Sequence, residues 1–267
     1  MSTPSAAPIA ATTPEHPTVL SVRGASKRFG VVSALEDFDL DVRRGEVLAL
    51  LGDNGAGKST LIKCLNGVHR LDSGVIEMDG VPVAIRTPAD ARALGIETVY
   101  QDLALFDNLR PTDNFYAGRE LAGPAWLPRS LRVLKRKRMT DATREVLERL
   151  QVSVPDFNAV VGLMSGGQRQ AVAVSRAAAF ASKVVILDEP TAALGVRESR
   201  KVLDLILRLR DENRAVVVVS HAMDHVMEVS DRAVVLRGGR KVGEVVQCGD
   251  LQTDRLADRG RWCVSRR

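Results

Sequence analysis

The stretch from Gly52 to Thr60 holds the residue types that bind the phosphate chain of a nucleotide. It reads Gly-Asp-Asn-Gly-Ala-Gly-Lys-Ser-Thr, which fits the P-loop pattern. Glycines let backbone N–H groups wrap the phosphates without Cβ clashes, Lys58 neutralises the β and γ phosphates, and the Ser59 hydroxyl can ligate Mg²⁺. A chance glycine turn is the alternative, but the apolar strand before the loop and the helix after it argue against that. We expect ATP and Mg²⁺ to be bound here by Gly52, Asp53, Asn54, Gly55, Ala56, Gly57, Lys58, Ser59 and Thr60.

Two adjacent acids supply the other half of a hydrolysis site. Asp188 and Glu189 directly follow the apolar run Val184 to Leu187. Asp188 is placed to hold Mg²⁺, directly or through water, and Glu189 is placed to orient and polarise the attacking water as general base. Taken alone, the pair could be a solvated acidic turn. A P-loop in the same chain makes the catalytic interpretation the stronger one.

A second glycine-containing segment, Met164-Ser-Gly-Gly-Gln-Arg-Gln170, precedes a helical pattern. Ser165 and Gln168 satisfy the capping-box form, so a plain helix start is the simple interpretation. Two adjacent glycines are more than a cap requires, and they favour close approach of a phosphate to the backbone. We expect a second anion site at Ser165, Gly166, Gly167 and Gln168.

Buried strands must position these residues. Val47 to Leu51, Val184 to Leu187 and Val216 to Val219 are short apolar runs typical of buried parallel strands, and the last one ends in Ser220 and His221. In open α/β sheets, ligands bind outside the carboxyl ends of the strands. Three separate segments therefore direct polar side chains to one crevice.

Apolar runs alternate with helical patterns along the chain, which predicts an α/β fold with a mainly parallel sheet. Val202, Leu205, Ile206 and Leu209 repeat at helical spacing and predict a helix that packs on this sheet. The alternation of apolar runs and helical patterns is interrupted from Arg110 to about Pro155. This stretch predicts a mostly helical insertion.

Composition limits the class of protein. Hydrophobic residues make up 45% and charged residues 27%, a soluble globular balance, and three widely spaced cysteines fit no metal or disulfide pattern. No stretch approaches the ~20 apolar residues that span a bilayer, and no secretion leader is visible, so we expect neither membrane crossing nor export. The net charge of +5 comes from scattered residues apart from short clusters such as Lys135 to Arg138. That basic run is compatible with nucleic-acid binding, but a solvent-exposed face of a helical segment explains it better.

The P-loop, the Ser-Gly-Gly-Gln segment, the Asp-Glu strand end and a later His occur in an order that resembles the ATP-binding cassette (ABC) ATPases. The resemblance extends from about Val19 to Val242. It implies a P-loop NTPase core joined by an antiparallel β subdomain and an inserted α-helical subdomain at about 104–180. The ABC ATPase domain would then cover 18–243, between a flexible tail (1–17) and a C-terminal extension (244–267).

The same resemblance assigns roles that the residues alone do not reveal. Phe29 would stack on adenine, Gln101 would link Mg²⁺ and the attacking water to a partner subunit, and His221 would contact the γ-phosphate. In isolation these could be a core aromatic, a surface residue and a satisfied histidine. In this family the Ser165–Gln168 segment caps the γ-phosphate held by a second cassette, which implies a head-to-tail homodimer with two ATP molecules sandwiched between its copies.

Two positions depart from the family pattern. Met164 stands where Leu is usual, a volume-conserving exchange. Gly195 stands where the interface loop usually ends in Asp, which removes a carboxylate expected to couple the two sites. A cassette that holds ATP without hydrolysing it is therefore an alternative. Because Glu189 and His221 remain, we expect ATPase activity.

Three segments resemble the cassettes of bacterial monosaccharide importers that handle ribose, xylose or fructose. They are Val99–Leu105, Asn114–Glu120 and Thr191–Ser199. One set of motifs without a repeat resembles the single-cassette type. This implies a peripheral subunit at the cytoplasmic face of the cell membrane, integral-membrane permease partners and, indirectly, a periplasmic sugar-binding protein. A soluble ABC ATPase acting on nucleic acid or the ribosome, and an importer of another solute, are the alternatives.

Overall fold

The computed structural model describes residues 16–124, 126, 132–192, 194–221, 223–247 and 262–265. Residues 1–15 of the predicted tail and most of the predicted C-terminal extension lie outside this part of the chain. No described helix is long and apolar enough to cross a lipid bilayer.

The larger sheet has seven strands in the order β13-β12-β11-β3-β10-β9-β6. The five strands from β11 to β6 run parallel, whereas β12 and β13 continue the sheet antiparallel at one edge. This confirms the mainly parallel sheet. The strands are β3 (Val47–Leu51), β6 (Ile96–Val99), β9 (Val184–Asp188), β10 (Ala215–Val219), β11 (Arg232–Arg237), β12 (Arg240–Gln247) and β13 (Trp262–Ser265).

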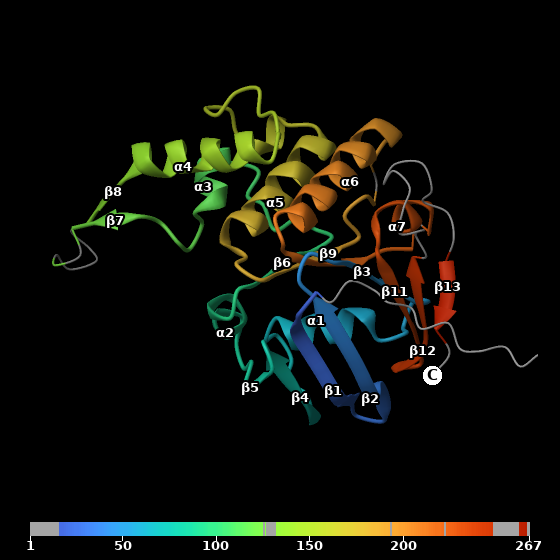
Figure 1. Ribbon diagram of the computed structural model, residues 1–267. Helices are drawn as coiled ribbons and strands as arrows, with labels where there is room; N and C mark the ends of the chain where they lie inside the picture. The colour runs from blue at the N-terminus through green and yellow to red at the C-terminus, as the bar shows by residue number, and fades with distance from the viewer. Residues whose placement is uncertain are drawn as a thin grey trace, which may run out of the picture.

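A second sheet of four antiparallel strands, in the order β2-β1-β4-β5, confirms the expected β subdomain. Helix α1 shares one hydrophobic core with both sheets. Figure 1 shows this layer below the parallel strands. The elements are β1 (Thr18–Phe29), β2 (Val32–Arg43), α1 (Lys58–Leu65), β4 (Ser73–Met78), β5 (Val81–Val83) and α2 (Pro88–Ala93).

Helices α5 (Gly166–Phe180) and α6 (Val196–Asp211) cover the opposite face of the parallel sheet, above it in Figure 1. Both faces of the parallel sheet must be covered, because the side chains of β10 alternate between two hydrophobic cores. Val217 and Val219 pack with α1, whereas Val216 and Val218 pack with α5 and α6. The short helix α7 (Met223–Val229) follows β10 and contacts α6.

The predicted helical insertion contains helices and also a hairpin that the sequence did not reveal. Helices α3 (Pro111–Phe115) and α4 (Arg136–Arg149) build a small core with α5, and a 3-10 helix (Val161–Leu163) leads into α5. Strands β7 (Ala122–Gly123) and β8 (Val133–Leu134) pair between α3 and α4 and lie at the far left of Figure 1. Two-residue strands are too short to show a period of alternation.

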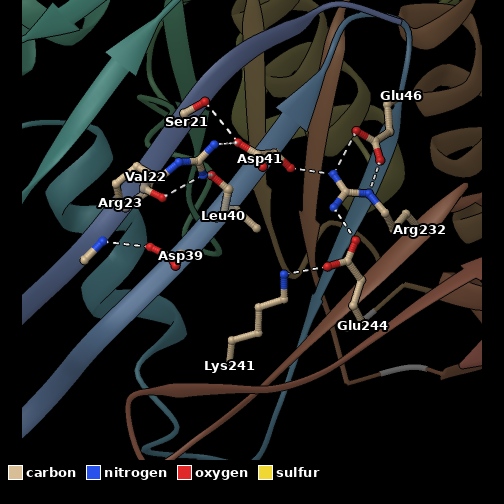
Figure 2. Close-up of polar contacts among 11 residues, drawn as sticks. Ser21, Val22, Arg23, Asp39, Leu40, Asp41, Glu46, Arg232, Lys241 and Glu244 are labelled. Carbon is tan, nitrogen blue, oxygen red and sulfur yellow. Dashed lines mark hydrogen bonds and ion pairs between the residues drawn. The ribbon is translucent and has the colours of Figure 1, made fainter. Parts of the chain in front are cut away.

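A buried arginine at the start of β11 joins the two sheets (Figure 2). The Arg232 side chain is 4% exposed and lies between the carboxylates of Glu46, at 2.6 Å, and Glu244, at 2.8 Å. It also donates to the backbone carbonyl of Asp41 on β2. Strand β12 carries Glu244 and runs past position 243, where the sequence predicts the end of the ATPase domain. The predicted domain bounds remain predictions.

Candidate functional site

The glycine-rich loop connects β3 to α1, and its glycines serve different needs. A Cβ at Gly52 would lie 2.3 Å from the Leu236 carbonyl oxygen, and one at Gly57 would lie 2.5 Å from that of Ala34. Both glycines also have positive φ, so larger residues would be strained there. Gly55 has a positive φ but faces open space within 4 Å. Two glycines therefore allow tight packing, and the third leaves room for a ligand.

The Lys58 ammonium lies inside this loop. It donates to the carbonyl oxygens of Gly52, at 2.6 Å, and Asp53, at 3.1 Å, and the residue is only 7% exposed. The first turn of α1 contains no acid, so its positive helix end is not neutralised locally. A buried cation, a helix N-terminus and an open glycine fit a nucleotide phosphate chain.

The carboxyl ends of β9 and β10 bring the predicted acids and histidine together. Asp188 is the last residue of β9, and the Glu189 N–H donates to the Val219 carbonyl oxygen of β10 at 2.8 Å. His221 follows β10, and its Nε2 lies 3.0 Å from Glu189 Oε1. Because β10 lies between β3 and β9, this cluster is beside the strand that feeds the P-loop.

The Glu189 side chain has the properties of a water-activating base. The residue is 8% exposed, and burial raises the pKa of its carboxyl while His221 counteracts this. Its Oε1 lies 3.0 Å from His221 Nε2 but has no hydrogen-bond partner among the described residues. A buried carboxylate oxygen with spare acceptor capacity can bind and polarise a water molecule.

The metal-ligand prediction fits a nucleotide-bound cation rather than a protein cage. Within the described part of the chain, no group of three His, Cys, Asp or Glu residues could hold a metal ion by itself. Mg²⁺ at nucleotide sites takes one or two protein ligands and completes its shell with phosphate oxygens and water. Burial raises the pKa of Asp188, and the Lys58 charge opposes that shift. The exposed Ser59 hydroxyl and the Asp188 carboxylate fit such a partial shell.

The Ser165–Gln168 segment forms the predicted helix start. Ser165 is the N-cap of α5, and both bonds of the capping box with Gln168 are present. A Cβ at Gly167 would lie 2.5 Å from Glu198 Cγ, so close packing against α6 already requires that glycine. The doubled glycine is therefore not by itself evidence for a phosphate. Helix α5 packs on the opposite sheet face from α1, so these two motifs do not share a core.

Phe29 and Gln101 lie on the surface. Phe29 ends β1 with its side chain 44% exposed, beside the His69 ring at a centroid distance of 5.1 Å and beneath Lys27. Gln101 is exposed and lies two residues beyond Val99, the last residue of β6, which is the neighbour of β9. These positions leave an aromatic face and an amide available to a ligand, and their roles remain predictions.

Two hydrogen bonds near the site were not predicted. The Asn66 amide at the end of α1 donates to the Tyr100 hydroxyl, next to Gln101. Thr191 Oγ1 lies 2.9 Å from His225 Nδ1, which connects the segment after Glu189 to α7. No local sequence pattern could have indicated either pair, because the partners are distant in the chain.

Comparisons with known proteins agree with this geometry. A family model described as ABC transporter matches residues 35–192, more than half of the chain. A fructose import ATP-binding protein of Rhizobium meliloti is 49% identical over 225 residues, 84% of this chain and 86% of that protein. A xylose/arabinose import ATP-binding protein of Sulfolobus acidocaldarius is 45% identical over 222 residues, 83% of this chain and 86% of that protein.

A solved structure supports the fold in particular. A nucleotide-free ATP-binding cassette from an ABC transporter has a TM-score of 0.74 with this chain at 25% sequence identity. The match covers 85% of this chain and 90% of that one. Both the P-loop NTPase fold and the resemblance read from the sequence are confirmed. The chain belongs to the ABC transporter family.

Proposed function

We propose that this chain hydrolyses ATP to drive uptake of a sugar through membrane permease partners. The observation that carries the proposal is the cluster at the carboxyl ends of β3, β10 and β9. Lys58, Glu189 and His221 lie in the segments that follow three adjacent strands, and the Glu189 and His221 side chains lie 3.0 Å apart. A phosphate-binding cation beside a buried base is the arrangement that hydrolysis of a nucleoside triphosphate requires.

Each residue has one task in this mechanism. Lys58 and the N–H groups of Gly52–Thr60 offset the charge of the β and γ phosphates, and Phe29 stacks on the adenine. Ser59, Asp188 and Gln101 hold Mg²⁺, which further offsets phosphate charge when bound. Glu189 orients and polarises the attacking water, and His221 contacts the γ-phosphate while restraining the Glu189 carboxylate.

The functional unit is a head-to-tail pair of chains. The Ser165–Gln168 segment is presented by α5, on the sheet face opposite α1, which argues that it serves the ATP of a second copy. Apolar side chains beside it are exposed, Leu163 by 80% and Val196 by 88%. An interface between copies would cover them. Binding of two ATP molecules would close this pair, and hydrolysis would release it.

The substrate is proposed from the relatives. Their names specify import of fructose and of xylose or arabinose, and they share 49% and 45% identity with this chain. We therefore propose a monosaccharide as cargo, recognised by the permease and a periplasmic binding protein. The chain would sit at the cytoplasmic face of the membrane, with permease helices docked beside Gln101 and the helical insertion.

Phosphate release by the purified protein tests the assignment of Glu189. Glu189→Gln keeps the size of the side chain but removes the base, so hydrolysis should fall by about 100-fold or more. ATP binding should persist, and the ATP-bound dimer should accumulate. Glu97→Gln is the matched control, because Glu97 is an ion-paired acid on β6, 2.8 Å from Arg119. Equal activity of wild type and Glu189→Gln would refute the role of Glu189.

A further inference from the structure

The segment 121–140 of the helical insertion is strongly basic. It contains Lys or Arg at six positions and no Asp or Glu. Basic residues occur throughout the chain, but acids balance them outside this segment, because the net charge of the whole chain is only +5. The six residues are Arg129, Arg132, Lys135, Arg136, Lys137 and Arg138.

Four of these cations lie together at the start of α4, and all four are exposed. Arg136 has an ion pair with Asp113, at 3.7 Å, whereas the other three side chains have no hydrogen bond or ion pair to any described residue. The first turn of α4 contains no acid, and its N-cap, Lys135, makes no side-chain cap bond. Because a helix N-terminus is itself partly positive, these charges oppose folding of the helix. Fold stability therefore does not account for the cluster.

Exposed apolar side chains adjoin the cluster. Trp126 is 80% exposed, Val133 74% and Leu134 40%. Val133 pairs with Gly123 in the β7–β8 hairpin, and Trp126 lies within about 11 Å of that glycine, because only three residues of chain separate them. The Lys135 stem also lies over this hairpin, since a Cβ at Gly123 would be 2.8 Å from Lys135 Cε. We call this set the hairpin end: Trp126, Val133, Leu134, Lys135, Lys137 and Arg138.

The hairpin end projects from the rest of the molecule. Figure 1 shows β7, β8 and the start of α4 at the far left, beyond both sheets and opposite β12 and β13. The buried side chains of α4, such as Met139 and Leu147, pack instead in the small core with α3 and α5. A projecting end of this kind can contact an extended surface without any rearrangement of the core.

The combination of side chains favours a lipid surface that carries negative charge. Clustered Lys and Arg residues are attracted to anionic headgroups. Tryptophan prefers the headgroup level of a bilayer, and aliphatic side chains enter the boundary with the acyl chains. Neither contribution is strong alone, but a basic cluster together with an apolar insertion gives stable peripheral binding. Exposure to solvent explains the cations and leaves Trp126, Val133 and Leu134 unexplained.

A nucleic acid fits the same surface less well. It would use the cations but not the aliphatic side chains. The groove along this part of α4 is also lined by the carboxylates of Asp141 and Glu145, which would repel a phosphodiester chain lying in it. These acids are about 6 and 12 Å beyond Lys137 along the helix. A surface that meets only the hairpin end avoids them.

We propose that the hairpin end is a membrane-contact site for a bilayer surface rich in anionic lipid. Trp126, Val133 and Leu134 enter the headgroup layer, while Lys135, Lys137 and Arg138 pair with lipid phosphates. This inference goes beyond the proposed function, because the contact needs neither ATP nor a permease. It would hold the helical insertion against the membrane beside the permease.

The first experiment is cosedimentation of the full-length protein with protein-free vesicles, without nucleotide. Vesicles of phosphatidylglycerol and phosphatidylcholine should bind the protein, vesicles of phosphatidylcholine alone should bind it far less, and added salt should weaken the binding. Combining Lys137→Gln with Arg138→Gln should weaken binding by about 30-fold. The melting temperature of that variant should not fall, because the lost charges oppose the helix dipole.

A matched control removes the same charge elsewhere. Lys201→Gln combined with Arg240→Gln changes exposed side chains on α6 and β12, away from the hairpin in Figure 1. This variant should bind anionic vesicles nearly as well as wild type. If it loses as much binding as the Lys137 and Arg138 variant, overall charge rather than the hairpin end causes adsorption, and the inference is overturned.

The second experiment detects insertion of Trp126. The chain has two tryptophans, so Trp262→Phe leaves Trp126 as the single indole fluorophore. Its emission should shift to shorter wavelength on anionic vesicles and be quenched by lipids brominated on the acyl chains. Trp126→Ala should weaken binding by about tenfold at low and at high salt, because the lost contribution is apolar.

Two results would overturn the inference. One is no binding to protein-free anionic vesicles; if the Lys137 and Arg138 variant then loses binding to duplex DNA, the hairpin end serves nucleic acid instead. The other is vesicle binding without any change in Trp126 emission. Neither result affects the proposed function, because the vesicle assays contain no ATP and no permease. Equal hydrolysis by wild type and Glu189→Gln would, conversely, leave the membrane contact untouched.

Discussion

Backbone geometry fixes the Glu189 carboxylate more firmly than its position in the sequence suggests. Its φ is +52°, an uncommon value for a residue with a side chain, and its N–H is held by the Val219 carbonyl oxygen. The chain therefore turns sharply at the end of β9 and directs the side chain toward His221. Such strain persists only where the surroundings enforce it, and it often marks functional positions.

The glycines of the P-loop offer a paired prediction. Gly52→Ala should lower the melting temperature, because its Cβ would lie 2.3 Å from the Leu236 carbonyl oxygen. Gly55→Ala has open space around it and should cost about 1 kcal/mol, mainly from its positive φ. Its main effect should instead be weaker ATP binding. Thermal unfolding and nucleotide titration of both variants check this, and a less stable Gly55→Ala than Gly52→Ala would contradict it.

Residues next to strand ends could be predicted, whereas their partners could not. Lys58, Asp188 and His221 follow apolar runs that are visible in the sequence, so their place at one sheet edge follows from the fold class. The Thr191–His225 contact joins residues 34 positions apart. The packing of Glu198 on Gly167 depends on how α5 and α6 meet, which no periodicity reveals.

The most deeply buried strands and helices were the ones that the sequence predicted correctly. Strand β3 begins and ends where the continuous apolar run does, and the predicted helix with Val202 and Leu209 is α6. Weakly buried elements were less predictable. The β7–β8 pair was missed, because two-residue strands lack a clear apolar signal.

The contact between β2, β11 and β12 predicts a pH-dependent stability. Burial alone would raise the pKa of Glu244, but hydrogen bonds from Lys241 and Arg232 outweigh it and lower that pKa. A lowered carboxyl pKa stabilises the fold above the unfolded value, about 4.3, and this contribution is lost as the pH falls through the folded value. Glu244→Gln should therefore reduce the free energy of unfolding by about 1–2 kcal/mol at neutral pH.

Denaturant unfolding at several pH values measures that difference. The deficit of Glu244→Gln relative to wild type should shrink on acidification below the ordinary glutamate range. Glu36→Gln removes an exposed partner of Arg240 and should show little deficit at any pH. A Glu244→Gln deficit that stays constant down to low pH would mean that lost packing, rather than the ion pair, causes it.

At the scale of the whole molecule, the sheet separates the P-loop from the Ser165–Gln168 segment. The P-loop helix α1 packs in the layer shared with the antiparallel sheet, while α5 packs with α6 on the other face. Figure 1 shows these layers on opposite sides of the parallel strands. This separation favours an ATP site completed by a second copy, in which exposed Leu163 and Val196 become buried.

Mixing two inactive variants tests this composite site most directly. Lys58→Ala disables the P-loop, and Ser165→Arg blocks the exposed N-cap of α5. Neither homodimer therefore contains a complete site. A mixed pair contains one complete site, because the P-loop of one chain meets the Ser165 segment of the other. We predict that phosphate release reappears when the two purified variants are mixed. A mixture as inactive as either variant alone would contradict the head-to-tail account.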